Sequence, residues 1–208
     1  MKKQSTIFII VIFLLLLIGC QEQNEPTTDA PLDNFFANTE LNYGEYVFIF
    51  EDVVARALAM DLEDKTLEKW VIRALGDEKL SNKRDFTPDE ALKIAKENQA
   101  ENQAWITVAE EKYDMRVSEE ELDQWITAGP DQSEIPQQKA FADALKLSLT
   151  ELNHEFDREL YKQTLTWEKL IPVLEKKYET NDQEVLLDKY MEQVEQEKKI
   201  QMKKTTGV

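Results

Sequence analysis

Apolar side chains recur every three or four positions along most of the chain after residue 60, with charged residues between them. This spacing predicts amphipathic helices, because residues three and four positions apart share one face of a helix. Asp64 has the character of an N-cap for a helix that runs through Trp70 and stops at Gly76. Residues 137–147 form a further helical segment with Phe141 on its apolar face. The pattern therefore predicts a mainly α-helical body.

Four predicted helix starts carry a capping residue that is followed three positions later by Glu, an arrangement typical of a capping box. These starts are Thr87-Pro88-Asp89-Glu90, Ser118-Glu119-Glu120-Glu121, Ser148-Leu149-Thr150-Glu151 and Asn181-Asp182-Gln183-Glu184. The first opens a long helix toward Tyr113, and Gly129-Pro130 ends the second. The third helix carries an apolar stripe as far as Leu174, and Pro172 is expected to kink or restart it.

Residues 43–50 are ambiguous because they are rich in aromatic and β-branched side chains, which favour strands. From Asp52 to Met60, however, Ala and Leu recur at helical spacing. We expect at most one short strand near residues 45–50, followed by a helix.

The beginning of the chain has the pattern of an export signal. Lys2 and Lys3 precede an unbroken run of twelve apolar residues at 7–18. Twelve helical residues reach only about 18 Å, against a hydrocarbon core of roughly 30 Å, so the run fits a signal peptide better than a membrane-spanning helix. Leu17-Ile18-Gly19-Cys20 resembles the lipobox of bacterial lipoproteins, in which cleavage precedes the cysteine and the cysteine is acylated. An uncleaved anchor is the alternative, and it also places the protein at a membrane.

The lipobox resemblance implies three parts. Residues 1–19 are the expected lipoprotein signal peptide, and Cys20 is the expected lipid anchor on the extracytoplasmic face of the bacterial cell membrane. Residues 20–33 are polar and lack apolar periodicity, which indicates a flexible tether. Residues 34–208 form the expected helical domain.

The composition is strongly acidic, with 42 Asp and Glu against 25 Lys and Arg and a formal net charge of -17. A negative field of this size repels phosphate backbones, so nucleic acid is not an expected partner. Cys20 is the only cysteine, so no intramolecular disulfide can form.

Between about residues 92 and 178 the order of motifs resembles the helical chaperone domain of PrsA- and SurA-type extracytoplasmic foldases. The motifs are Ala-Glu-Glu-Lys-Tyr at 109–113, Val-Ser-Glu-Glu-Glu-Leu at 117–122, the Ser148 start, and Asn-Asp-Gln-Glu-Val at 181–185. The resemblance implies an orthogonal or elongated helical domain. In those foldases a β-rich parvulin isomerase module follows the last motif, whereas only 24 residues remain here after Glu184. We therefore expect no isomerase chemistry and no enzymatic activity.

The resemblance implies binding of unfolded or translocating polypeptides near the membrane. Such binding requires apolar side chains that line an open cradle between helices. Aromatic and Leu side chains at helical spacing are more often part of a core, so a core role is the alternative to client binding for such residues. The candidate client-binding residues are Trp105, Trp125, Phe141, Leu145, Leu149, Phe156 and Trp167.

Two further hypotheses complete the sequence-based view. The same scaffold could instead dock one folded membrane or cell-envelope partner as an interaction lipoprotein.

His154 is the sole histidine, and no Ser, Cys or second His accompanies it in a catalytic or metal-binding pattern, so we expect a structural or surface role. No cofactor or metal is expected, and the oligomeric state stays open.

Overall fold

The computed structural model describes residues 41–206, and their regular structure is entirely helical. The expected signal peptide at 1–19, Cys20 and the expected tether at 20–33 lie outside the described residues. The mainly α-helical class predicted from the sequence is confirmed. In chain order the elements are α2 (Tyr43–Leu58), α3 (Lys65–Asn82), α4 (Pro88–Tyr113), α5 (Glu119–Ala128), the 3-10 turn η1 (Pro130–Gln132), α6 (Pro136–Leu145), α7 (Leu149–Glu151), the π-helical turn η2 (Leu152–Phe156), α8 (Arg158–Tyr178) and α9 (Gln183–Thr206).

The expected strand near residues 45–50 is wrong, because these residues lie within α2. The Asn42 side chain accepts hydrogen bonds from the backbone N–H groups of Gly44 and Glu45. The Glu45 carboxylate in turn accepts one from the Asn42 backbone N–H at 2.8 Å, which completes a capping box. Burial of one helical face outweighs the strand preference of the individual residues. That buried face consists of Tyr46, Phe50, Val53, Val54 and Ala57.

Most of the other helix starts follow the predicted caps. Thr87 and Ser148 each form the complete box with the Glu three positions later. Ser118 accepts the expected backbone hydrogen bond at 3.2 Å. The last start differs by one residue, because Asp182, and not Asn181, accepts the first N–H groups of α9.

The predicted stop at Gly76 is wrong. α3 continues to Asn82, and the chain leaves the helix through Lys83 in the left-handed region at φ 52°. Gly76 and Leu80, about one helical turn later, are both buried. Burial of the last turns therefore outweighs the cost of glycine in a helix, about 1 kcal/mol relative to alanine.

The helix predicted from Ser148 to Leu174 is divided into two by η2. There the backbone N–H of Asp157 donates to the carbonyl of Leu152, five positions earlier, at 2.8 Å. After this turn α8 runs through Pro172 as one helix, so the proline does not restart it.

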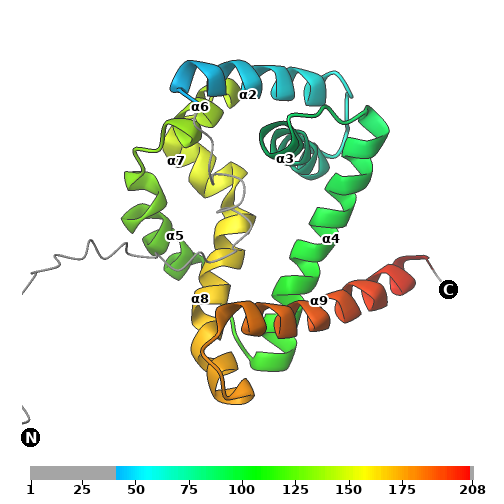
Figure 1. Ribbon diagram of the computed structural model, residues 1–208, viewed down its shortest axis with the longest axis vertical. Helices are drawn as coiled ribbons and strands as arrows, with labels where there is room; N and C mark the ends of the chain where they lie inside the picture. Colours follow the sequence, from blue (N-terminus) through cyan, green and yellow to red (C-terminus); the bar gives the residue numbers. More distant parts are fainter. Residues whose placement is uncertain (1–40, 207–208) are drawn as a thin grey trace, which may run out of the picture.

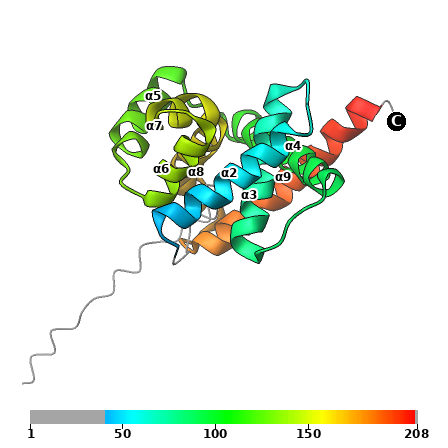
Figure 2. The ribbon, with the colours of Figure 1, turned by 90° about the horizontal axis from the view of Figure 1, so that it is seen from above.

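The helices form an elongated frame, of which α4 and α8 are the long sides (Figure 1). α2 crosses one end of the frame and α9 crosses the other (Figure 1). Viewed from above, α2 lies across the top between α6 on one side and α3 on the other (Figure 2). The inner face of α2 is therefore covered by two helices, while no other helix among residues 41–206 lies above its opposite face.

The frame contains two separate hydrophobic clusters. The upper cluster joins α2, α3, α5, α6 and η2 to the first halves of α4 and α8. Between the clusters, the Asn102 side chain donates a 2.9 Å hydrogen bond to Oε1 of Gln163, whose side chain is buried. The lower cluster consists of Ala104, Trp105, Val108, Ala109, Trp167, Leu170, Leu174, Leu186, Tyr190 and Val194.

The last helix packs on the body through the first half of its length. Leu186, Tyr190 and Val194 are fully buried, and the Tyr190 hydroxyl donates to the backbone carbonyl of Trp105 at 2.8 Å. Beyond Val194 the contact becomes polar, because Lys198 lies 2.9 Å from Glu101. The C-terminal part of α9 projects past α4 (Figure 1).

Candidate functional site

The seven residues expected to line a cradle are not gathered on one open surface. Trp105 and Trp167 belong to the lower cluster, where each is only 4% exposed. Their rings meet at a centroid distance of 5.7 Å, and both pack against Tyr190. These two side chains form the core that holds α9.

Phe141 and Phe156 lie in the upper cluster and are also buried. Their rings are 5.5 Å apart in an edge-on arrangement, and Phe141 contacts Phe50 of α2 at 4.8 Å. They join α6 and η2 to the underside of α2. For Trp105, Trp167, Phe141 and Phe156, the structure therefore supports the core reading over an open lining.

The remaining three candidates are half-buried at the edge of the upper cluster. Leu145 and Leu149 pack against it from α6 and α7. Trp125 does so from α5, and its indole N–H donates to the Glu168 carboxylate at 3.1 Å. None of the three has a largely free side chain.

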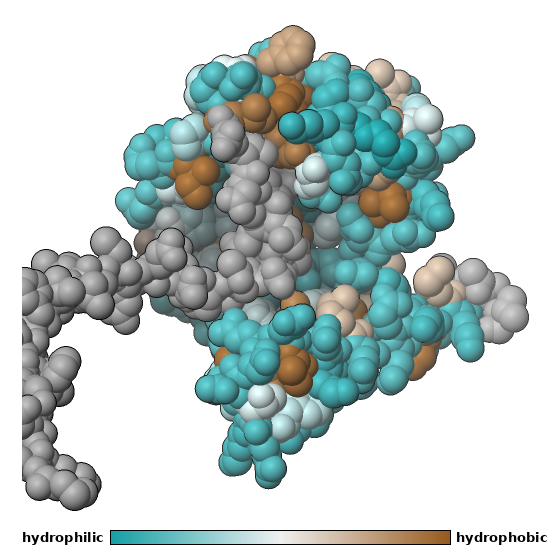
Figure 3. All heavy atoms as spheres, in the orientation of Figure 1, coloured by the Kyte–Doolittle hydropathy of each residue, from teal (hydrophilic) through white to brown (hydrophobic). Residues whose placement is uncertain are grey.

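The most exposed large apolar side chain among residues 41–206 is Phe48 of α2, at 75%. Leu58, ten positions later, is 53% exposed. Phe48 lies opposite the buried face of α2, and Leu58 lies on its flank, about 80° round the helix from Phe48. Hydrophobic atoms gather at this end of the molecule (Figure 3). We call this surface the α2 outer face, and its exposed residues at helical spacing are Phe48, Glu51, Asp52, Ala55, Leu58 and Ala59.

Arg56 is shared between the carboxylate of Asp52 on the α2 outer face and the carboxylate of Asp85. The Arg56 guanidinium lies 2.7 Å from Asp85 but 3.9 Å from Asp52. It also donates to the backbone carbonyl of Phe86. Arg56 is therefore engaged mainly by the segment that joins α3 to α4, and the outer face combines apolar side chains with net negative charge.

Tyr43, at the start of α2, is held differently from Phe48. Its hydroxyl donates to the Asp143 carboxylate of α6. This hydrogen bond to a carboxylate is the main reason why the pKa of Tyr43 is raised above its usual value. The contact fixes the N-terminal end of α2 to α6.

His154 joins three elements, η2, η1 and α5. Its Nε2 lies 3.0 Å from Asp131 of η1, and its Nδ1 lies 3.4 Å from Asp123 of α5. Asn153 also donates to Asp131, at 2.9 Å. Arg158 donates to Asp123 and holds the pKa of that carboxyl below its usual range. These contacts give His154 a structural role in fixing α5 and η1 to η2.

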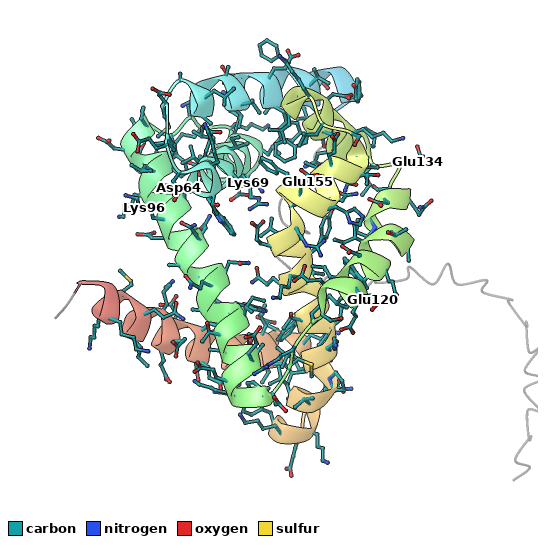
Figure 4. The ribbon with its side chains drawn as sticks, turned by 180° about the vertical axis from the view of Figure 1, so that it is seen from behind. Asp64, Lys69, Lys96, Glu120, Glu134 and Glu155 are labelled. Atoms are coloured by element: carbon teal, nitrogen blue, oxygen red, sulfur yellow. The ribbon has the colours of Figure 1, made fainter. Side chains whose placement is uncertain are left out.

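Basic side chains of α3 close the frame across its inner side. Lys69 and Glu155 face one another there, and the Lys69 ammonium donates to the Glu155 backbone carbonyl at 2.7 Å (Figure 4). Arg73 donates twice to one Asp157 oxygen, at 2.9 and 3.1 Å, and its guanidinium lies over the rings of Trp70 and Phe156. Burial raises the pKa of Asp157, and Arg73 opposes this rise.

Among residues 41–206, no three His, Cys, Asp or Glu side chains are grouped so that they could hold a metal ion. No helix in this range combines the length and apolarity needed to cross a bilayer. Comparisons with protein-family models, curated proteins and solved structures find no match for this chain. The α2 outer face is therefore proposed as the candidate site on its geometry alone.

Proposed function

We propose that the protein is a lipid-anchored extracytoplasmic binder of unfolded or exported polypeptides, without isomerase chemistry, and that it binds them through the α2 outer face. The exposure of Phe48, at 75%, is the observation that carries this proposal. Complete burial of a Phe or Leu side chain contributes about 1.5–3 kcal/mol relative to leaving it in water. The outer face therefore retains apolar surface that a client segment can cover.

The support beneath α2 favours this role. Phe50 and Val53 on the inner face are completely buried, so the helix is already ordered before any client arrives. A preorganised surface loses little conformational entropy on binding. Glu51 and Asp52 between the apolar residues provide hydration that keeps the free surface soluble.

The same surface also supports a second candidate function, the docking of one folded partner. Ten helical positions separate Phe48 from Leu58, which corresponds to about 15 Å along the axis. A single straight helix of this length can fit a groove or a neighbouring helix on a folded membrane or cell-envelope protein. The two functions differ in whether the bound polypeptide is unfolded.

An aggregation assay tests the proposal. The full chain, held in nanodiscs of zwitterionic lipid, is expected to slow the aggregation of a chemically unfolded model protein. Phe48→Ser combined with Leu58→Ser is expected to abolish this effect without changing the helical circular dichroism spectrum. Val185→Ser combined with Ile200→Ser is the matched control, because both residues are exposed apolar side chains of α9.

Three outcomes separate the alternatives. Loss of protection in the α2 variant alone supports polypeptide binding at the outer face. Equal protection by both variants would place binding elsewhere on the molecule. No protection by the parent chain would exclude the chaperone-like function and leave docking of a folded partner as the remaining use of this surface.

A further inference from the structure

The α2 outer face carries more negative than positive charge. Glu51 and Asp52 lie between its two large apolar side chains, and both are exposed. Arg56 of the same helix donates to Asp85 and to a backbone carbonyl, and it also pairs with Asp52 at 3.9 Å. A segment lying along the face therefore meets the carboxylates of Glu51 and Asp52 and one guanidinium, which Asp52 shares with Asp85.

The charge of the whole chain acts in the same direction. Its formal net charge of -17 gives a field that attracts cationic segments and repels anionic ones before contact. At physiological salt this field is screened over about 8 Å, so the two local carboxylates decide the preference once a segment has arrived.

We infer that the outer face selects polypeptide segments in which apolar residues alternate with Lys or Arg. This inference rests on the proposed function and names its class of client. Glu51 and Asp52 follow Phe48 by three and four helical positions, about 5–6 Å along the axis. An extended client rises about 3.3 Å per residue. A client with an apolar residue on Phe48 would therefore place a basic residue about two positions later, opposite these carboxylates.

The position of Leu58 completes the client pattern. The axial rise of about 15 Å from Phe48 to Leu58 corresponds to between four and five residues of an extended chain, which must also cross about 80° of the helix surface. The best segment therefore has two apolar residues about four or five positions apart, with Lys or Arg between them. A client with Glu at the middle position would have the same apolar contacts but would face repulsion.

Fluorescence anisotropy with three labelled peptides tests this preference. The peptides have identical apolar residues and carry Lys, Gln or Glu at the intervening positions. In about 10 mM salt the Lys peptide is expected to bind the full chain in zwitterionic nanodiscs about tenfold more tightly than the Glu peptide. In about 500 mM salt the three affinities should converge.

Charge reversal assigns the preference to α2. Glu51→Lys combined with Asp52→Lys is expected to reverse the order of the Lys and Glu peptides. Asp188→Lys combined with Glu192→Lys is the matched control, since it changes the net charge equally at exposed positions of α9. This control should keep the order of the parent chain.

The results distinguish this inference from the proposed function. Equal binding of the Lys and Glu peptides by a chain that still prevents aggregation would overturn the charge preference alone. An unchanged preference in the Glu51 and Asp52 variant would overturn its assignment to α2. If none of the peptides binds and the aggregation assay also fails, both proposals are wrong.

Discussion

The buried pair of Arg73 and Asp157 provides the sharpest test of the frame. Arg73 is 5% exposed and Asp157 is 1% exposed, so Arg73→Met would leave a carboxylate in the interior without its cation. Breaking a buried ion pair in this way costs about 3–5 kcal/mol. Since whole domains are stable by only about 5–15 kcal/mol, the loss should be obvious in urea unfolding at pH 7.

The pH dependence of this loss identifies its cause. Without Arg73, only burial acts strongly on Asp157, so its pKa in the folded variant should lie further above the ordinary value of 3.8 than in the parent. A carboxyl with a raised folded-state pKa contributes stability below its unfolded pKa and loses that contribution as the pH rises through the folded pKa. The deficit of the variant should therefore shrink toward about pH 4. At about pH 4 the remaining loss of stability should be about 1–2 kcal/mol, because the guanidinium no longer stacks on Trp70 and Phe156.

Urea unfolding of the parent and Arg73→Met chains at pH 7 and about pH 4, followed by circular dichroism, measures both effects. Lys189→Met is the control, because its side chain is 46% exposed and that of its partner Glu192 is 65% exposed. Its effect should be much smaller and should not show the same pH dependence. A loss under about 1 kcal/mol for Arg73→Met at pH 7, or an equal loss at both pH values, would refute the reasoning.

The remaining predictions concern packing and caps. Phe141→Ala should lower the free energy of unfolding by about 3–5 kcal/mol because the ring is completely buried. Phe48→Ala should change it by less than about 0.5 kcal/mol because this ring is exposed. Urea unfolding of the two variants checks this contrast, and similar losses would contradict the assigned burial. The Ser148 hydrogen bonds lower the pKa of Glu151 from its ordinary value of 4.5, so the contribution of this cap is present above that value and is lost as the pH falls through the folded-state pKa. Glu151→Gln should therefore make the melting temperature less sensitive to pH below about 4.5, and an unchanged pH profile would count against the cap.

Local signals predicted the helix starts well because a cap depends on residues within one turn. The boxes at Thr87 and Ser148 formed as expected for this reason. A local signal also argues against the strand that we expected at residues 45–50. Asn42 and Glu45 have the three-residue spacing of a capping box, and this signal predicts a helix in place of the strand.

Other features depend on partners far along the chain and could not be predicted from local patterns. Side chains of α3 bind the backbone carbonyls of η2. One of these side chains, Arg73, also contacts Asp157, which lies 84 positions later in the chain. Trp105 is buried against Tyr190, 85 positions away, so its sequence context alone could not separate core from cradle. The same limitation applies to Phe141 and Phe156, since burial depends on which helices lie opposite.

The composition of α2 connects the fold to the proposed function. A helix needs only one apolar face to pack on a body, and α2 uses Phe50 and Val53 for that purpose. Phe48 on the opposite face and Leu58 on the flank add exposed apolar surface, which contributes little to the core and favours association with other molecules. The carboxylates of Glu51 and Asp52 limit that association to partners that can satisfy negative charge. A surface with these two properties favours a reversible binder of apolar, basic polypeptide over a helix that serves only to complete the frame.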